Sequence, residues 1–127
     1  MNRSRGRGPR GVSRRHPDGL RRIAAALVDR KAVDPVVLDL RGLSEATDYF
    51  VIAGGTSDAH VRGMAEHLME RLAPHHVEGL AQGRWVLLDY VDVVVHLFHP
   101  ELREFYQLER LWADASPVTL DEVGTVG

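Results

Sequence analysis

Apolar residues recur every three or four positions in two segments of the chain, and this spacing predicts two amphipathic helices. The first helix is expected to begin at Asp18, whose carboxylate can cap backbone N–H groups, and to end at Asp34 because Pro35 follows. The second is expected after residues 54–58 and should end at Pro74. The two apolar stripes are Leu20, Ile23, Ala24, Leu27 and Val28, and then Val61, Met64, Ala65, Leu68, Met69 and Leu72.

Short segments rich in β-branched and aromatic residues predict strands. They cover residues 36–40, 48–53 and 77–80, followed by a hairpin at 85–98 with a tight reversal at residues 90–92. Strands that follow one another without an intervening helix pair antiparallel. A third helix is expected to start at residues 99–101, because proline suits a first turn. The sequence therefore predicts a single α/β (α+β) domain with a mixed sheet of four or five strands flanked by helices.

The hairpin has two chemically different faces, because side chains alternate along a strand. One face is apolar and is expected to pack on the helices; it comprises Val86, Leu88, Val93, Val95 and Leu97. The other combines an indole, aliphatic groups, two carboxylates and an imidazole; it comprises Trp85, Leu87, Asp89, Asp92, Val94 and His96. This mixture is typical of a protein–protein interface. The alternative is that Trp85 is a core residue and the acids are solvated turn residues.

Charge divides the 127-residue chain into two parts. Residues 1–17 carry six arginines and no acid, whereas residues 18–127 carry 10 basic and 18 acidic side chains, a balance of −8. The first segment is expected to be a disordered tail, either a solvated extension or a non-specific, weak contact to RNA phosphates. The acidic body favours a basic partner surface. Residues 114–127 are expected to be a second flexible tail.

The chain offers little support for catalysis. The absence of cysteine excludes thiolate chemistry and disulfides, and the seven histidines lack the spacing of a zinc site, so no metal or cofactor is expected. Gly54, Gly55, Thr56 and Ser57 form a candidate anion-binding turn, which leaves a nucleotide-binding transferase as the alternative function. Such an enzyme needs paired carboxylates for magnesium, and none follows the turn. The competing interpretation is that Ser57 or Thr56 simply caps the helix.

The compartment is expected to be the cytoplasm. The lack of cysteine fits a reducing compartment, and no apolar run approaches the roughly 20 residues that cross a membrane.

Several segments resemble the ribosomal silencing factor (RsfS, or Iojap) family. They run in order within residues 18–113: DYFVI at 48–52, GTS at 55–57, EG at 78–79, WVLLDY at 85–90, DVVVH at 92–96 and FYQLERLW at 105–112. The resemblance implies a fold related to nucleotidyltransferases that lacks their catalytic carboxylates. It also implies a non-enzymatic protein that binds the large ribosomal subunit through a uL14-type ribosomal protein, blocks joining of the small subunit and represses translation. Family members are often homodimers when free of the ribosome.

The resemblance adds residues of the third predicted helix to the hairpin as the partner-binding set. The full set is Trp85, Leu87, Asp89, Asp92, Val94, His96, Tyr106 and Glu109. Within it, Asp89 and Asp92 would meet basic side chains, and Trp85 would fill an apolar pocket.

This chain departs from the family at the hairpin turn. The family commonly has glycine before the position of Asp92, where this chain has Val91. A β-branched residue resists the positive φ that tight hairpin turns often require. We therefore expect either a longer turn or a turn type that tolerates valine.

Overall fold

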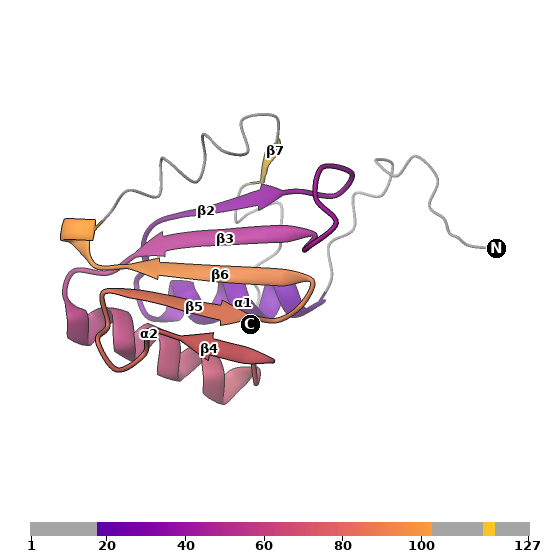
Figure 1. The fold of residues 1–127 in the computed structure, drawn as a ribbon. Helices are drawn as coiled ribbons and strands as arrows, with labels where there is room; N and C mark the ends of the chain where they lie inside the picture. The colour runs from indigo at the N-terminus through magenta and orange to yellow at the C-terminus, as the bar shows by residue number, and fades with distance from the viewer. Residues whose placement is uncertain (1–17, 103–115, 119–127) are drawn as a thin grey trace.

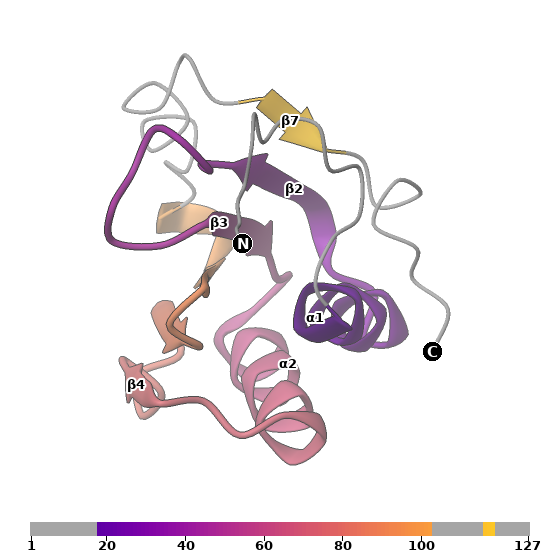
Figure 2. The same ribbon diagram turned by 90° about the vertical axis from the view of Figure 1, so that its right-hand side faces the viewer.

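Two α-helices and six strands make up the part of the chain that the computed structural model describes, which is residues 18–102 and 116–118. In chain order they are α1 (Asp18–Asp29), β2 (Val33–Asp39), β3 (Tyr49–Gly54), α2 (Asp58–Arg71), β4 (His76–Glu78), β5 (Trp85–Asp89), β6 (Val93–Phe98), the 3-10 helix η2 (Pro100–Leu102) and β7 (Ser116–Val118). The strands lie side by side in one sheet (Figure 1), and α1 and α2 pack together along one side of it (Figure 2).

The sheet has the order β4-β5-β6-β3-β2-β7. Its central pair, β3 and β6, is parallel, with Tyr49 opposite Val93 and Gly54 opposite Phe98. The other four neighbouring pairs are antiparallel, including the predicted β5–β6 hairpin. A mixed sheet in a single α+β domain was predicted and is confirmed, with five strands between residues 33 and 98.

The sixth strand lies within residues 114–127, the segment predicted to be a flexible tail, and the sequence did not predict a strand there. Residues 116–118 form β7, which pairs antiparallel with the edge of β2. A three-residue strand has no periodicity of its own, so this pairing between distant segments left no signal in the sequence.

Proline marks the helix ends less closely than predicted. Helix α1 ends at Asp29, and Pro35 lies inside β2 instead of closing the helix. The pairing of β2 with β3 shifts register between Val33 and Val36, and such an irregularity accommodates a residue that has no N–H to donate. Helix α2 ends at Arg71, three residues before Pro74.

Apolar side chains are buried on both faces of the sheet. The larger cluster joins the predicted stripes of α1 and α2 to the predicted apolar face of the hairpin, where Val86, Leu88, Val93, Val95 and Leu97 are all buried, so the prediction for the hairpin face is confirmed. Val28 is the exception in the α1 stripe: it lies near the helix end and is 47% exposed. A second cluster lies on the opposite face; it comprises Leu38, Leu40, Ile52 and Phe98.

Several predictions concern residues outside the described ranges. These are the N-terminal tail at 1–17 and most of the third helix with Tyr106 and Glu109, of which the structure describes only η2 at the expected start. Within residues 18–102 and 116–118, no helix combines the length and apolarity that a membrane crossing requires.

Candidate functional site

The β5–β6 hairpin turns one row of side chains away from α1 and α2. Cross-strand pairs place Trp85 opposite Phe98, Leu87 opposite His96 and Asp89 opposite Val94. Because these residues alternate with the buried inner row, they share the other side of the sheet. We call this row the outer face; it comprises Trp85, Leu87, Asp89, Val94, His96 and Phe98.

Trp85 is a surface residue, which excludes its interpretation as a core aromatic. Its side chain is 48% exposed at the start of β5. The indole packs on the ring of Phe98, with 5.0 Å between the centroids, and its Nε1–H donates a hydrogen bond to His96 Nδ1 at 3.1 Å. A large aromatic that is half exposed yet fixed on its inner edge suits an interface anchor.

His96 lies on the same face but is only 5% exposed. Its ring meets Phe50 edge to face, with centroids 5.0 Å apart, and stacks near Phe98 at 6.3 Å. Burial lowers the pKa of His96 to about 4, so the ring is neutral at pH 7. The structure therefore leaves little of this predicted contact residue available to a partner.

Phe50 and Phe98 belong to this aromatic cluster but were not among the predicted site residues. Phe98 was accessible to the same reasoning, because it follows His96 by two positions and must share its face. Phe50 comes from β3 and joins the cluster only through the parallel pairing with β6, in which it lies opposite Val94. That contact spans more than 40 residues of sequence, so no local pattern reports it.

The two acids of the hairpin lie at its turn end. Asp92 is exposed, and its carbonyl oxygen accepts hydrogen bonds from the backbone N–H groups of Asp48 and Tyr49, both at 3.0 Å. Asp89 is half-buried, and its Oδ1 accepts a hydrogen bond from the N–H of Val91 at 2.8 Å. The turn backbone is thus held firmly while the Asp92 carboxylate faces solvent.

Both expectations for the turn at Val91 are wrong. The reversal is as tight as predicted, and Val91 itself adopts the positive φ, at +73°. The N–H of Asp92 donates to the carbonyl oxygen of Tyr90 at 2.9 Å, which together with this φ describes a γ-turn centred on Val91. A valine in this conformation is strained, since its Cβ crowds the backbone.

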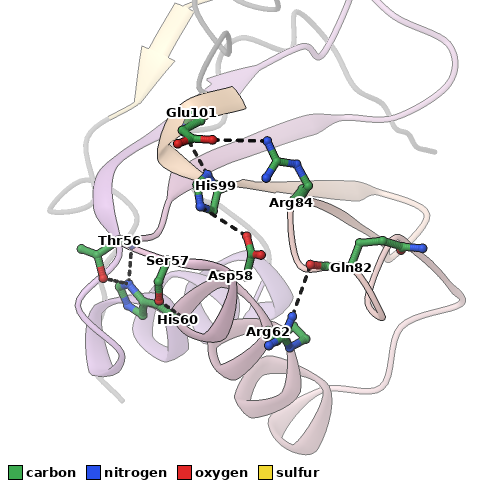
Figure 3. Close-up of polar contacts among 9 residues, drawn as sticks. All are labelled: Thr56, Ser57, Asp58, His60, Arg62, Gln82, Arg84, His99 and Glu101. Atoms are coloured by element: carbon green, nitrogen blue, oxygen red, sulfur yellow. Dashed lines mark hydrogen bonds and ion pairs between the residues drawn. The ribbon is translucent and has the colours of Figure 1, made fainter.

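Two backbone N–H donors of the turn at residues 54–57, those of Gly55 and Thr56, have acceptors within the protein, and Figure 3 shows the contact of Thr56. Gly55 N–H donates to the carbonyl oxygen of Phe98 at 3.0 Å. Thr56 N–H donates to His60 Nδ1 at 2.8 Å, and His60 N–H donates to Ser57 Oγ at 3.0 Å. Ser57 is the N-cap of α2, as the competing interpretation held. An incoming anion would have to displace these internal acceptors, so the geometry favours a structural role.

A polar network beside this turn ties β6 to α2 (Figure 3). His99 Nε2 lies 3.3 Å from Asp58 Oδ1, an ion-pair distance without hydrogen-bond geometry. His99 Nδ1 accepts from the N–H of Glu101 at 3.0 Å, and the N–H of His99 donates to the carbonyl oxygen of Arg84 at 2.7 Å. Both ring nitrogens of His99 thus contact groups of the protein itself. This arrangement suits a residue that connects two segments better than a general base.

The hollow on the helix side carries little chemistry. It has a volume of about 490 Å³ and is lined by Gly19, Leu20, Ile23, Leu72, Ala73, Pro74, His75, Tyr90, Asp92 and Val93. The hydroxyl of Tyr90 is engaged, since it donates its hydrogen to the carbonyl oxygen of Leu72 at 2.8 Å. Asp92 is the one carboxylate among the lining residues. Across the described part of the chain, no three histidine, aspartate or glutamate side chains are placed to hold a metal ion.

Curated relatives and solved structures agree on what this chain is similar to. It is 42% identical over 103 residues to the ribosomal silencing factor RsfS of Bacillus subtilis (strain 168), covering 77% of this chain and 87% of that protein. It is 35% identical over 98 residues to a Mus musculus protein named mitochondrial assembly of ribosomal large subunit protein 1, covering 71% of this chain and 43% of that protein. A crystal structure from Bacillus halodurans superposes with a TM-score of 0.70 at 36% identity, covering 80% of this chain and 97% of that one. Another from Chromobacterium violaceum gives 0.72 at 30% identity, covering 87% and 92%.

The sequence model of one protein family, described as ribosomal silencing factor during starvation, matches residues 13–126. This match extends further at both ends than residues 18–113, where the recognisable motifs lie. The chain belongs to the ribosomal silencing factor (RsfS) family.

Proposed function

We propose that this protein binds the large ribosomal subunit through the outer face of the β5–β6 hairpin and prevents the small subunit from joining. The observation that carries this proposal is Trp85, a half-exposed indole at the open end of a hairpin whose turn end carries two acids. Half-exposed aromatic anchors that are fixed by their neighbours are typical of binding hot spots. The family supports a ribosome-associated function, and the name of the mouse relative refers to the large ribosomal subunit.

The partner on the subunit is proposed to be a uL14-type ribosomal protein. The body of the chain from residue 18 onward has a charge balance of −8, which complements a basic ribosomal protein. Asp92 is the exposed acid of the turn and would meet an arginine or lysine, whereas Trp85, at the other end of the hairpin, would enter an apolar pocket. The protein acts here by occupying space and needs no catalysis, cofactor or metal.

The test is cosedimentation with purified large subunits, followed by a subunit-joining assay. Trp85→Ala is expected to weaken binding roughly 30-fold or more, the loss typical of a hot-spot residue, and to restore joining. The matched control is Val28→Ala, because Val28 is equally exposed (47%) but lies near the end of α1. Equal binding by wild type and Trp85→Ala, with both proteins folded, would refute the proposed surface.

Charge and partner identity need separate variants. Asp92→Asn is expected to weaken binding mainly at low salt, whereas Glu70→Gln, at an exposed acid of α2, should have no effect. A photo-crosslinking amino acid at position 85 should attach to the uL14-type protein. Crosslinks confined to another ribosomal protein would refute the partner while leaving the surface intact.

Further parts of the proposal concern the free protein. We place it in the cytoplasm, as a homodimer that dissociates on the ribosome, with only weak RNA contact by residues 1–17. Deletion of those residues is expected to leave subunit binding nearly unchanged. A nucleotide-binding transferase remains the rival function, and a saturable thermal shift with nucleotide and magnesium at micromolar concentration would favour it over silencing.

A further inference from the structure

The hydrogen bond between Trp85 and His96 connects an exposed side chain to a buried one. Trp85 is 48% exposed and His96 is 5% exposed, so only the indole offers substantial area to a partner. The bond joins indole Nε1 to imidazole Nδ1 at 3.1 Å, across neighbouring antiparallel strands. His96 can therefore affect binding mainly by positioning the residues that it contacts.

This hydrogen bond determines which ring nitrogen of His96 carries the proton. An indole nitrogen can only donate, so Nδ1 of His96 must accept and must be unprotonated. The proton of the neutral ring then resides on Nε2, which is buried and has no hydrogen-bond partner among the described residues. Burial also lowers the pKa of His96 to about 4, which keeps the ring neutral at ordinary pH.

The remaining contacts of His96 fix the ring itself. Phe50 meets it edge to face at 5.0 Å between centroids, and Phe98 lies nearly parallel to it at 6.3 Å, with an interplanar angle of 15°. Phe98 also supports the indole at 5.0 Å. These ring contacts restrict translation of the indole, and the hydrogen bond directs its Nε1–H toward His96.

We propose that His96 is a positioning residue for the partner-binding indole: its neutral ring, protonated on Nε2, holds Trp85 in one orientation before the partner arrives. An anchor that is already oriented loses less conformational freedom on binding, which improves affinity without adding a contact. This inference rests on the proposed function for its effect on binding, whereas the hydrogen bond itself can be tested in the free protein.

The first measurement uses the wild-type protein and nitrogen-15 NMR. The His96 ring is expected to show an unprotonated Nδ1 and a protonated Nε2, with the Trp85 indole hydrogen coupled to Nδ1. The chain has two tryptophans, so Trp85→Phe assigns the signal. A ring protonated on Nδ1 would overturn the inference without the use of any variant at His96.

The second measurement compares substitutions at residue 96. His96→Phe keeps an aromatic ring but removes the acceptor, so the Trp85 indole hydrogen should exchange with solvent roughly tenfold faster, and large-subunit affinity should fall roughly two- to tenfold. His96→Asn returns an acceptor near Nδ1 and should recover the slow exchange. His76→Phe, at an exposed histidine of β4, is the control and should change neither quantity.

The outcomes separate the two proposals. Slow indole exchange in His96→Phe, equal to that of the wild type, would overturn the role of His96 even if Trp85 binds the subunit. Full subunit binding by Trp85→Ala would refute the docking surface, and with it the effect on affinity, whatever the NMR data show.

Discussion

Val91 is conformationally strained in the tight turn of the hairpin, and Val91→Gly should make the protein more stable. An L-residue at positive φ costs about 1–2 kcal/mol relative to glycine, and Val91 has φ +73°. Glycine also gives the unfolded chain more conformational freedom, which lowers the stability gain by about 0.5–1 kcal/mol. The valine side chain is 56% exposed and contributes little burial, so the net gain should be about 1 kcal/mol.

Thermal and urea denaturation would measure this gain. For a chain of this size, about 1 kcal/mol corresponds to a rise in melting temperature of roughly 4 °C. The control is Val91→Ala, which removes most of the side chain but keeps the Cβ that causes the strain, so it should gain less than half as much. A glycine variant that is no more stable than wild type, or an alanine variant that matches it, would show that the turn is not strained.

Three further predictions concern the same region. The pKa of His96 falls from 6.5 to about 4 on folding, so between these pH values the unfolded chain binds one proton more than the folded protein. The free energy of unfolding should therefore drop by about 3 kcal/mol as the pH falls from 6.5 towards 4. In urea denaturation followed against pH, His96→Phe should remove that part of the slope. Gly79→Ala should cost about 3 kcal/mol in the same assay, since Gly79 has φ +80° and an added Cβ would meet the carbonyl oxygen of Trp85 at 2.1 Å. Tyr90→Phe should cost about 1 kcal/mol by removing the hydroxyl donor to the carbonyl of Leu72, and an unchanged urea midpoint would show that water replaces it.

Local patterns predicted helices α1 and α2, the hairpin and its inner face, because each depends on the spacing of residues a few positions apart. The outer face was predicted less completely. Alternation placed Trp85 and His96 together, yet it could not show that one is exposed and the other buried, since Phe50 reaches His96 through a strand distant in sequence. The strand β7 was missed for the same reason.

The turn shows a different limit of the sequence. Propensity correctly identified Val91 as unsuited to positive φ, and the expectation that the chain would avoid that conformation was wrong. The hydrogen bonds of Asp89 and Asp92 fix the backbone around Val91, and tertiary contacts of this kind override the preference of one residue.

The parallel pairing of β3 with β6 also has a consequence for synthesis of the chain. Strand β3 ends at Gly54, and its partner is complete only at Phe98, 44 residues later. At 5–20 residues per second, a ribosome needs roughly 2–9 s to make that stretch. During this interval one edge of β3, in the middle of the future sheet, has no strand to pair with. An unpaired strand edge promotes aggregation, so a protein that we propose to act on ribosomes carries such an edge while it is itself still being made by one.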